Sequence, residues 1–300
     1  MLRNFLLLYN PISGKGDTKK ILNIYNKYIA LYPNYNFYTH QTDATAEYEA
    51  VKKIIKTENI TDVIIAGGDG SVNQVVHALH HLPIKFGIVP RGSGNGLALA
   101  AGLPTNYNKA LQFILNNKAK PTDAFLINNK FACMLAGLGF DAQVAADFAV
   151  SPTRGLTTYT KLVFKNLIKA KPYPFKITTN NITVEVESYL TCIANSNQFG
   201  NRFTIAPKAK LDDGLLDIVI IGKMNKLFFL LQTLKQVTGF NKLIHVENLT
   251  SNKAMLYFQT PDLIITNVQN APLHIDGEAA ATYKHFDIKV LPHYFNLIRK

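Results

Sequence analysis

The stretch IIAGGDGSVNQVVHAL at residues 64–79 decides the fold of the first part of the chain. Its apolar start at residues 63–66 is typical of a buried parallel strand, and valines and leucines recur at helical spacing from residue 72 to residue 79. The glycines and Asp69 between them therefore occupy a strand-to-helix turn, where a helix N-terminus favours an anion such as phosphate. Asp69 brings a negative charge to that place, so we interpret it as a group that holds a cation or removes a proton.

Strand and helix patterns alternate on both sides of this stretch. Strands are expected at residues 3–9, near residue 37, at 63–66 and at 84–89, and helices are expected to begin near residues 17, 45, 71 and 94. Such alternation predicts a parallel sheet with helices on both faces, which is a Rossmann-like α/β domain.

The pattern changes after about Pro121, where short apolar runs alternate with turn signals. Examples are the Asn-Asn of FKITTNNITVEV and the Asp-Asp-Gly of KLDDGLLDIVII, and such signals are typical of hairpins. We therefore expect a mostly antiparallel second half, interrupted by helices at residues 155–170 and 225–237. The domains are placed at residues 1–122 and 123–300, and a return of the extreme C-terminus to the first domain is left open.

Composition limits the partners and the compartment. The chain has 300 residues and a formal net charge of +12, which suits nucleotides, an anionic membrane surface or nucleic acid. No nucleic-acid-binding signature or basic tail is present, so we expect no nucleic-acid partner. Cys133 and Cys192 are the only cysteines, and no run approaches the roughly 18 apolar residues of a spanning helix. We expect a cytoplasmic protein that associates peripherally with membranes.

Three glycine-rich loops follow expected strands, namely NPISGKG at residues 10–16, GGDG at 67–70 and PRGSGNG at 90–96. A single glycine loop is as well explained by a tight turn, but three at the ligand-binding edge of one sheet favour a phosphate site. The first loop lacks the Walker A spacing. GLGFDA at residues 137–142 matches a dinucleotide fingerprint, but it lies among expected hairpins, so we expect no dinucleotide site there.

These loops, together with AGLGFDA, APKAKLDDGLLDIVI and HIDGEA in the same order, resemble the diacylglycerol kinase catalytic-domain superfamily, which includes bacterial lipid kinases and sphingosine kinases. The similarity extends from about residue 10 to residue 279. It implies a nucleotide-binding α/β domain, a β-sandwich-like lipid-substrate domain, an ATP site between them, and Mg²⁺-dependent phosphate transfer to a lipid hydroxyl.

The resemblance also implies roles for individual residues. Asp69 and Glu278 compete for the role of general base, and Asp141 matches the carboxylate that holds the lipid head group in sphingosine kinases. Asp69 and Asp213 are candidate metal ligands, although a plain hairpin turn explains Asp213 better. The implied nucleotide-binding residues are Asn10, Ser13, Gly14, Lys15, Thr42, Gly67, Gly68, Gly70, Ser93, Asn95 and Arg154. Arg154 also fits a solvated surface residue, and Asp276 and Glu278 also fit an exposed turn.

The acceptor lipid is open between a long-chain base and a diacylglycerol-like alcohol. Gly96 stands where bacterial diacylglycerol kinases usually have a carboxylate, and this departure favours the long-chain base. A non-catalytic nucleotide- or lipid-binding regulatory protein is the alternative, against which the retention of Asp69 and Glu278 speaks. Two basic amphipathic segments, at residues 160–171 and 226–234, fit either a membrane interface or packing against the sheet. The oligomeric state is open, a homodimer included.

Overall fold

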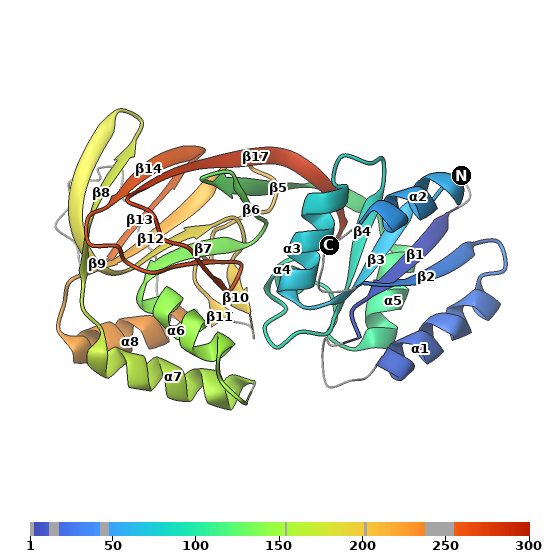
Figure 1. Ribbon diagram of the computed structural model, residues 1–300, viewed down its shortest axis with the longest axis horizontal. Helices are drawn as coiled ribbons and strands as arrows, with labels where there is room; N and C mark the ends of the chain where they lie inside the picture. Colours follow the sequence, from blue (N-terminus) through green and yellow to red (C-terminus); the bar gives the residue numbers. More distant parts are fainter. Residues whose placement is uncertain (1–2, 12–17, 43–47, 154, 201–202, 238–254) are drawn as a thin grey trace. The chain divides into compact units, whose positions relative to one another are not determined.

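The computed structural model describes residues 3–11, 18–42, 48–153, 155–200, 203–237 and 255–300. The chain forms two compact units, Met1–Thr122 with His293–Lys300, and Asp123–Pro292. It enters the second unit within β5 (Ala119–Ile127) and returns to the first within β17 (His285–Ile298), so the C-terminal segment is part of the first unit (Figure 1).

The first unit is built on a parallel sheet in the order β2–β1–β3–β4. Its strands are β1 (Asn4–Tyr9), β2 (Asn36–Gln41), β3 (Asp62–Gly67) and β4 (Lys85–Pro90), and the end of β17 joins β4 in parallel. Every residue of β3 is buried, as expected of a central parallel strand that is covered on both faces. The α/β class predicted for this part of the chain is confirmed.

Helices cover both faces of this sheet. Figure 1 shows α1 (Thr18–Leu31) and α5 (Tyr107–Asn116) on one face, and α2 (Glu49–Thr57) and α3 (Asp69–Leu79) on the other. The short α4 (Gly96–Ala100) follows β4. The apolar side chains of α3 that recur at helical spacing are buried, as the sequence predicts. The helix α5 was not expected; its N-cap is Asn106, whose side chain accepts a hydrogen bond from the backbone N–H of Lys109 at 3.1 Å.

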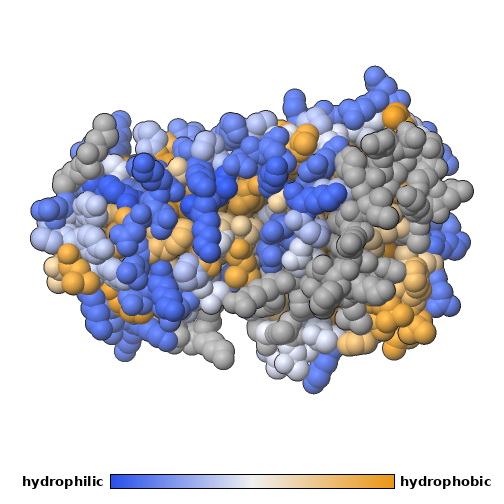
Figure 2. Space-filling view, turned by 180° about the vertical axis from the view of Figure 1, so that it is seen from behind, coloured by the Kyte–Doolittle hydropathy of each residue, from blue (hydrophilic) through white to orange (hydrophobic). Residues whose placement is uncertain are grey.

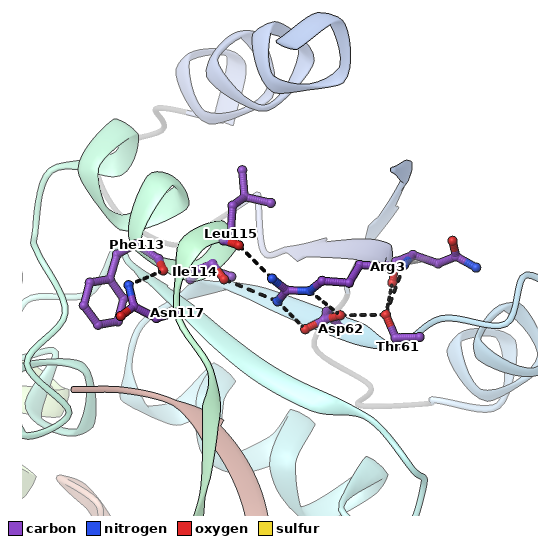
Figure 3. A network of polar contacts seen from close by, with 8 residues as sticks. Arg3, Thr61, Asp62, Phe113, Ile114, Leu115 and Asn117 are labelled. Atoms are coloured by element: carbon purple, nitrogen blue, oxygen red, sulfur yellow. Dashed lines mark hydrogen bonds and ion pairs between the residues drawn. The ribbon is translucent and has the colours of Figure 1, made fainter. Parts of the chain in front are cut away.

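A partly buried ion pair fixes the sheet at the amino ends of its strands (Figure 3). Arg3 donates to both carboxylate oxygens of Asp62, at 2.7 and 3.2 Å, and Asp62 has no exposed side-chain surface. The same guanidinium donates to the carbonyl of Leu115 at 2.7 Å, which is one of the carbonyls left without a partner at the end of α5. Arg3 therefore ties β1, β3 and α5 together at the edge opposite the glycine-rich loops.

The second unit is mostly antiparallel, as predicted. The long strand β9 pairs with β8 over its first half and with β7 and β12 over its second half, and strands of both branches contribute to one apolar core. The strands besides β5 and β17 are β6 (Lys130–Ala132), β7 (Leu135–Gly139), β8 (Tyr173–Thr179), β9 (Ile182–Ala194), β10 (Gln198–Gly200), β11 (Phe203–Thr204), β12 (Leu216–Gly222), β13 (Met255–Thr260), β14 (Asp262–Asn267), β15 (Leu273–Ile275) and β16 (Glu278–Ala280).

The turns of this unit follow the sequence signals in part. Asn180 and Asn181 join β8 to β9 with φ of 48° and 60°, the left-handed values that a two-residue type I′ hairpin requires. Asp276 and Gly277 join β15 to β16 in the same way, with φ of 49° and 84°. The Asp-Asp-Gly signal at residues 212–214 marks a turn in the loop before β12, not the hairpin that we expected.

Three helices lie in the described residues of the second unit, and two of them are at the predicted places, α7 (Leu156–Lys169) and α8 (Lys226–Val237). The third, α6 (Phe140–Ala149), was not expected because its sequence, FDAQVAADFA, has no clear polar face. The motif at residues 137–142 thus spans a strand-to-helix turn and does not lie among hairpins. Its strand, β7, pairs antiparallel on both sides, so it is still not a βαβ unit. Among the residues described, no helix has the length and hydrophobicity to cross a membrane.

Candidate functional site

The carboxyl ends of the parallel strands bring the first-unit loops to one edge. Tyr9 is paired with Gln41 and with Ala66, and Gly67 is paired with Pro90, so all four strands end at nearly the same level. The chain leaves β1 toward β2 on one side, while β3 lies on the other side of β1. This reversal of strand order is where open α/β sheets bind ligands. The loops after β1 and β3 flank it.

The glycines of the second and third loops allow two backbones to pack against each other. A Cβ atom placed on Gly92 would lie 2.6 Å from the Cα of Gly68, and one placed on Gly68 would lie 3.0 Å from the Cα of Gly92. The backbone N–H of Arg91 also donates to the carbonyl of Gly67 at 2.9 Å. Glycine is therefore needed at both positions for this backbone contact, and the nucleotide-binding role of Gly68 stays a prediction.

Asn95 shapes the third loop from within. Its side-chain oxygen accepts the N–H of Gly92 at 2.7 Å, and its side-chain nitrogen donates to the carbonyl of the same residue at 2.7 Å. Its own φ of 54° places it in the left-handed region as the N-cap of α4. Both polar atoms of this side chain are therefore used to fold the loop. Ser93, in contrast, is exposed.

Arg91 is a site residue that sequence reasoning missed. Its side chain is buried, and it donates to the carbonyl of Asn10 at 3.1 Å and to the hydroxyl of Thr18 at 3.2 Å. Asn10 and Thr18 stand at the two ends of the first glycine-rich loop, so one guanidinium joins both ends. Its Nε atom has no hydrogen-bond partner, and no carboxylate pairs with it, within the described residues. A buried cation in this state fits a site that takes an anion.

Asp69 is the first residue of α3 and is half-buried. It is the one carboxylate in the described parts of these loops, and it stands in the first turn of the helix, where the partial positive charge of the N-terminus stabilises nearby anions. Gly70 lies in the same first turn, and Gly67 ends β3. Thr42 follows β2 and donates its backbone N–H to the carbonyl of Tyr9 at 3.0 Å. At this edge the described residues of the first unit thus supply backbone amides, the cation of Arg91 and the carboxylate of Asp69.

In the second unit Asp141 is paired with His274. Both are buried, and the Nε2 atom of His274 lies 3.1 Å from the Oδ2 atom of Asp141. The backbone N–H of Gly277 points to Nδ1 of the same ring at 3.3 Å, so Nδ1 is an acceptor and the ring proton is on Nε2, directed at Asp141. The other carboxylate oxygen accepts the N–H of Ala142 at 2.9 Å. Both oxygens of Asp141 therefore have partners within the protein.

This pair explains a glycine of the AGLGFDA motif. A Cβ atom on Gly137 would lie 2.5 Å from the Nε2 atom of His274 and closer still to Asp141. The charge of Asp141 also acts on neighbouring groups. Burial raises the pKa of Tyr159 and of Cys192, and the charge of Asp141 adds to the rise in each pKa.

Asp276 and Glu278, which are close in sequence, have different surroundings. The carboxylate of Asp276 is buried and accepts the backbone N–H groups of Cys133, Met134 and Leu135 at 2.9, 2.9 and 3.0 Å. The exposed-turn interpretation of Asp276 is therefore wrong, because its charge is enclosed and satisfied by backbone donors. Glu278 lies on β16 with an exposed side chain.

Family models match both units. The diacylglycerol kinase catalytic domain matches residues 4–127, and the YegS C-terminal NAD kinase beta sandwich-like domain matches residues 135–299. The chain belongs to the diacylglycerol kinase catalytic-domain superfamily. The resemblance predicted from the motifs is confirmed.

Individual members of the superfamily agree with this assignment. A probable lipid kinase YegS-like of Shewanella frigidimarina is 30% identical over 268 residues, which cover 84% of this chain and 82% of that protein. The diacylglycerol kinase of Bacillus subtilis is 25% identical, over 91% of this chain and 88% of that protein. The crystal structure of a putative diacylglycerol kinase from Bacillus anthracis has the same fold, with a TM-score of 0.81, 22% identity, and coverage of 99% and 97% of the two chains.

The predicted metal ligands are the carboxylates of Asp69 and Asp213. Within the described ranges, no three His, Cys, Asp or Glu side chains meet as a metal-binding group. Magnesium in kinase sites is held by one or two carboxylates together with substrate phosphates, so Asp69 alone fits that mode. Asp213 accepts the N–H of Leu215 at 3.2 Å, and burial raises its pKa, with a further rise from Asp123. Its metal role stays a prediction. Ser13, Gly14, Lys15 and Arg154 lie outside the described residues.

Proposed function

We propose that this protein is an ATP-dependent lipid kinase that transfers the γ-phosphate to a lipid hydroxyl at a membrane surface. The observation that carries the proposal is the edge of the first unit, where the buried guanidinium of Arg91 joins both ends of the first glycine-rich loop and Asp69 stands at the N-terminus of α3. Both features favour bound phosphate. Membership of the diacylglycerol kinase superfamily supports the same activity.

The residues of this edge have separate tasks in the proposed reaction. Backbone amides of the loops bind phosphate oxygens, and Arg91 keeps the ends of the first loop in place. Mg²⁺, when bound with ATP, neutralises charge on the phosphates. Asp69 is half-buried beside a helix N-terminus and holds the metal or takes the proton of the acceptor hydroxyl, whereas Glu278 is exposed and is the second candidate for the base. Phosphate transfer depends mainly on positioning and charge, so this set is sufficient.

For the acceptor we propose a neutral, diacylglycerol-like alcohol. A long-chain base carries an ammonium group and needs a carboxylate partner, for which Asp141 was the candidate. Asp141 is 5% exposed, and its two oxygens already accept hydrogen bonds from His274 and from the N–H of Ala142. Because Asp141 has these partners, it is a poor partner for an ammonium group, and we give this argument more weight than the missing carboxylate at Gly96, which favoured a long-chain base. Relatives such as the B. subtilis protein bear the name diacylglycerol kinase.

A transfer assay with labelled ATP, Mg²⁺ and a panel of diacylglycerol, monoacylglycerol and sphingosine tests the proposal. We expect kcat/KM for diacylglycerol to exceed that for sphingosine by at least about tenfold, a difference of roughly 1.4 kcal/mol. We expect Asp141→Asn to lower kcat/KM by the same factor for diacylglycerol and for any amine substrate. The reason is that the carboxylate binds His274 and the N–H of Ala142 and does not bind the substrate. A selective loss on sphingosine contradicts the neutral acceptor. Nucleotide binding without transfer to any lipid contradicts the kinase and favours the regulatory alternative.

A further inference from the structure

The turn between β15 and β16 places Glu278 at the surface of the second unit. Its two residues, Asp276 and Gly277, have φ of 49° and 84°, and β16 is the last strand in the order of its sheet. A Cβ atom placed on Gly277 would meet no described atom within 4 Å, so the outer side of the turn is open. The direction in which Glu278 leaves the turn therefore depends on contacts made from inside the unit.

Asp276 makes the first of these contacts. Its carboxylate accepts the three backbone N–H groups of residues 133–135, and its own backbone N–H donates to the carbonyl of Leu135 at 2.8 Å. Hydrogen bonds to an ionised carboxylate are among the strong ones in proteins, so the first residue of the turn is firmly held. These bonds do not involve the second residue of the turn, Gly277.

His274 makes the contact with Gly277. Its Nδ1 atom accepts the backbone N–H of Gly277 at 3.3 Å, and its Nε2 atom donates to Asp141 on α6 at 3.1 Å. A neutral imidazole has one donor and one acceptor, so a carboxylate that takes the proton on Nε2 leaves Nδ1 free to accept. Two hydrogen bonds in series therefore connect Asp141 to the residue that precedes Glu278.

The helix α6, which carries Asp141, has partners of its own on α7. The buried side chain of Asn166 donates to Asp147 at 3.1 Å, and Phe148 meets Tyr159 edge to face with 5.7 Å between the ring centroids. The helix α7 lies at the surface, where Figure 2 shows hydrophobic residues over α7 and α8 at the lower right. Asp141 is thus a fixed point for the imidazole.

We propose that His274, oriented by Asp141, positions the β15–β16 turn so that Glu278 is presented to the acceptor hydroxyl. The inference rests on the proposed function, in which Glu278 is a candidate for the base. His274 is a positioning residue, because it is buried and acts through Gly277. It also explains why Asp141→Asn should affect every acceptor alike. An amide at that position can donate to Nε2, which moves the ring proton to Nδ1, where it opposes the N–H of Gly277.

Two substitutions of His274 separate the two ends of its ring. In His274→Asn the amide oxygen lies near the place of Nδ1 and still accepts the N–H of Gly277, whereas in His274→Gln the amide lies near the place of Nε2 and reaches only Asp141. We expect His274→Gln to lower kcat for diacylglycerol by at least about tenfold, with the KM for ATP within about twofold of the parent, because only the presentation of Glu278 changes. His274→Asn should keep kcat within about threefold, and His285→Gln, at an exposed position on β17, is the control.

Melting temperatures distinguish positioning from a merely structural role. His274→Asn leaves the buried carboxylate of Asp141 without its donor, so it should be the less stable of the two variants although it is the more active one. A kcat that falls in the same order as stability, or by the same factor in both variants, overturns the proposal.

Two further measurements test whether His274 acts through the turn. In the background of Glu278→Gln, His274→Gln should cause no further loss of kcat, and an additional loss of about tenfold overturns the proposal. A parent-like rate of Glu278→Gln alone also overturns it, while a kinase centred on Asp69 still stands.

Hydrogen exchange of the Gly277 N–H, followed by NMR, needs no turnover. It should be faster in His274→Gln than in His274→Asn, and equal exchange overturns the contact. This measurement decides the contact even if the parent transfers phosphate to no lipid, a result that contradicts the proposed function instead.

Discussion

One guanidinium, that of Arg91, holds both ends of the first glycine-rich loop. Lysine at this position keeps the charge but cannot bridge two acceptors in the fixed geometry of a guanidinium. We expect Arg91→Lys to raise the KM for ATP by about tenfold or more, the size of one lost charged hydrogen bond, with a smaller change in kcat. Steady-state kinetics and nucleotide binding measure this. A parent-like KM contradicts the role of Arg91 in positioning the loop.

Only glycine fits at position 137, because the side chains of Asp141 and His274 occupy the place of a Cβ atom. In Gly137→Ala the new methyl group meets Asp141 and His274, so we expect the free energy of unfolding to fall by about 1–3 kcal/mol or more. Chemical denaturation measures the loss. In the background of Asp141→Ala the same substitution should cost less, since part of the clash is gone. Equal costs in the two backgrounds contradict the contact.

At the level of single residues, a site residue was predictable where its neighbours in the sequence are unusual for its type. It was not predictable where its partners are far away in the sequence. Asp69 was recognised because a carboxylate is unexpected in a phosphate loop. His274 was missed although it lies in a quoted motif, because its partner Asp141 is 133 positions away. Arg91 was missed because its contacts are with the ends of another loop. A basic residue inside PRGSGNG was the one available signal.

At the scale of elements, the pairing of β12 with β13 encloses a carboxylate. Asp217 is fully buried and accepts hydrogen bonds from Tyr257 and Gln259, and burial raises its pKa to about 6. The folded state therefore holds this proton more tightly than the unfolded state. The free energy of unfolding therefore falls by about 2–3 kcal/mol as the pH rises from about 4 to about 6.

Asp217→Asn removes this titration. We expect its free energy of unfolding, relative to the parent, to improve by about 2–3 kcal/mol between pH 4 and pH 7, whatever the constant offset from altered hydrogen bonds. Urea denaturation across this pH range gives the difference. A difference that does not vary with pH contradicts a raised pKa for Asp217.

Elements with one strong periodic signal were predictable from the sequence, and those without were not. The buried run of β3, the Asn-Asn turn before β9 and the amphipathic α7 were all recognisable. The helix α6 was missed because it is apolar on most sides, so that helical and strand periods are indistinguishable. The Asp-Asp-Gly turn was misplaced because a turn signal does not say whether the flanking segments pair.

For the whole molecule, the hydrophobic pattern predicted the fold class. A parallel sheet with helices and an antiparallel β-rich part differ in this pattern over many residues. The candidate site is spread over separate loops of each unit, and contacts such as those of Arg91 and His274 exist only after folding. The net charge of +12 is likewise a property of the whole chain, and the structure adds that the lysines of α7, within the basic segment at residues 160–171, are exposed.

The transfer of labelled phosphate from ATP to diacylglycerol by Asp69→Asn tests the central claim most directly, with Asp287→Asn as the control at an exposed position on β17. The amide has nearly the shape of the carboxylate but neither takes a proton nor binds Mg²⁺ as well. We predict that Asp69→Asn melts like the parent and loses at least about 100-fold in rate, while the control keeps its rate. Retention by Asp69→Asn of more than about a tenth of the rate, a barrier change below roughly 1.4 kcal/mol, contradicts a site centred on Asp69.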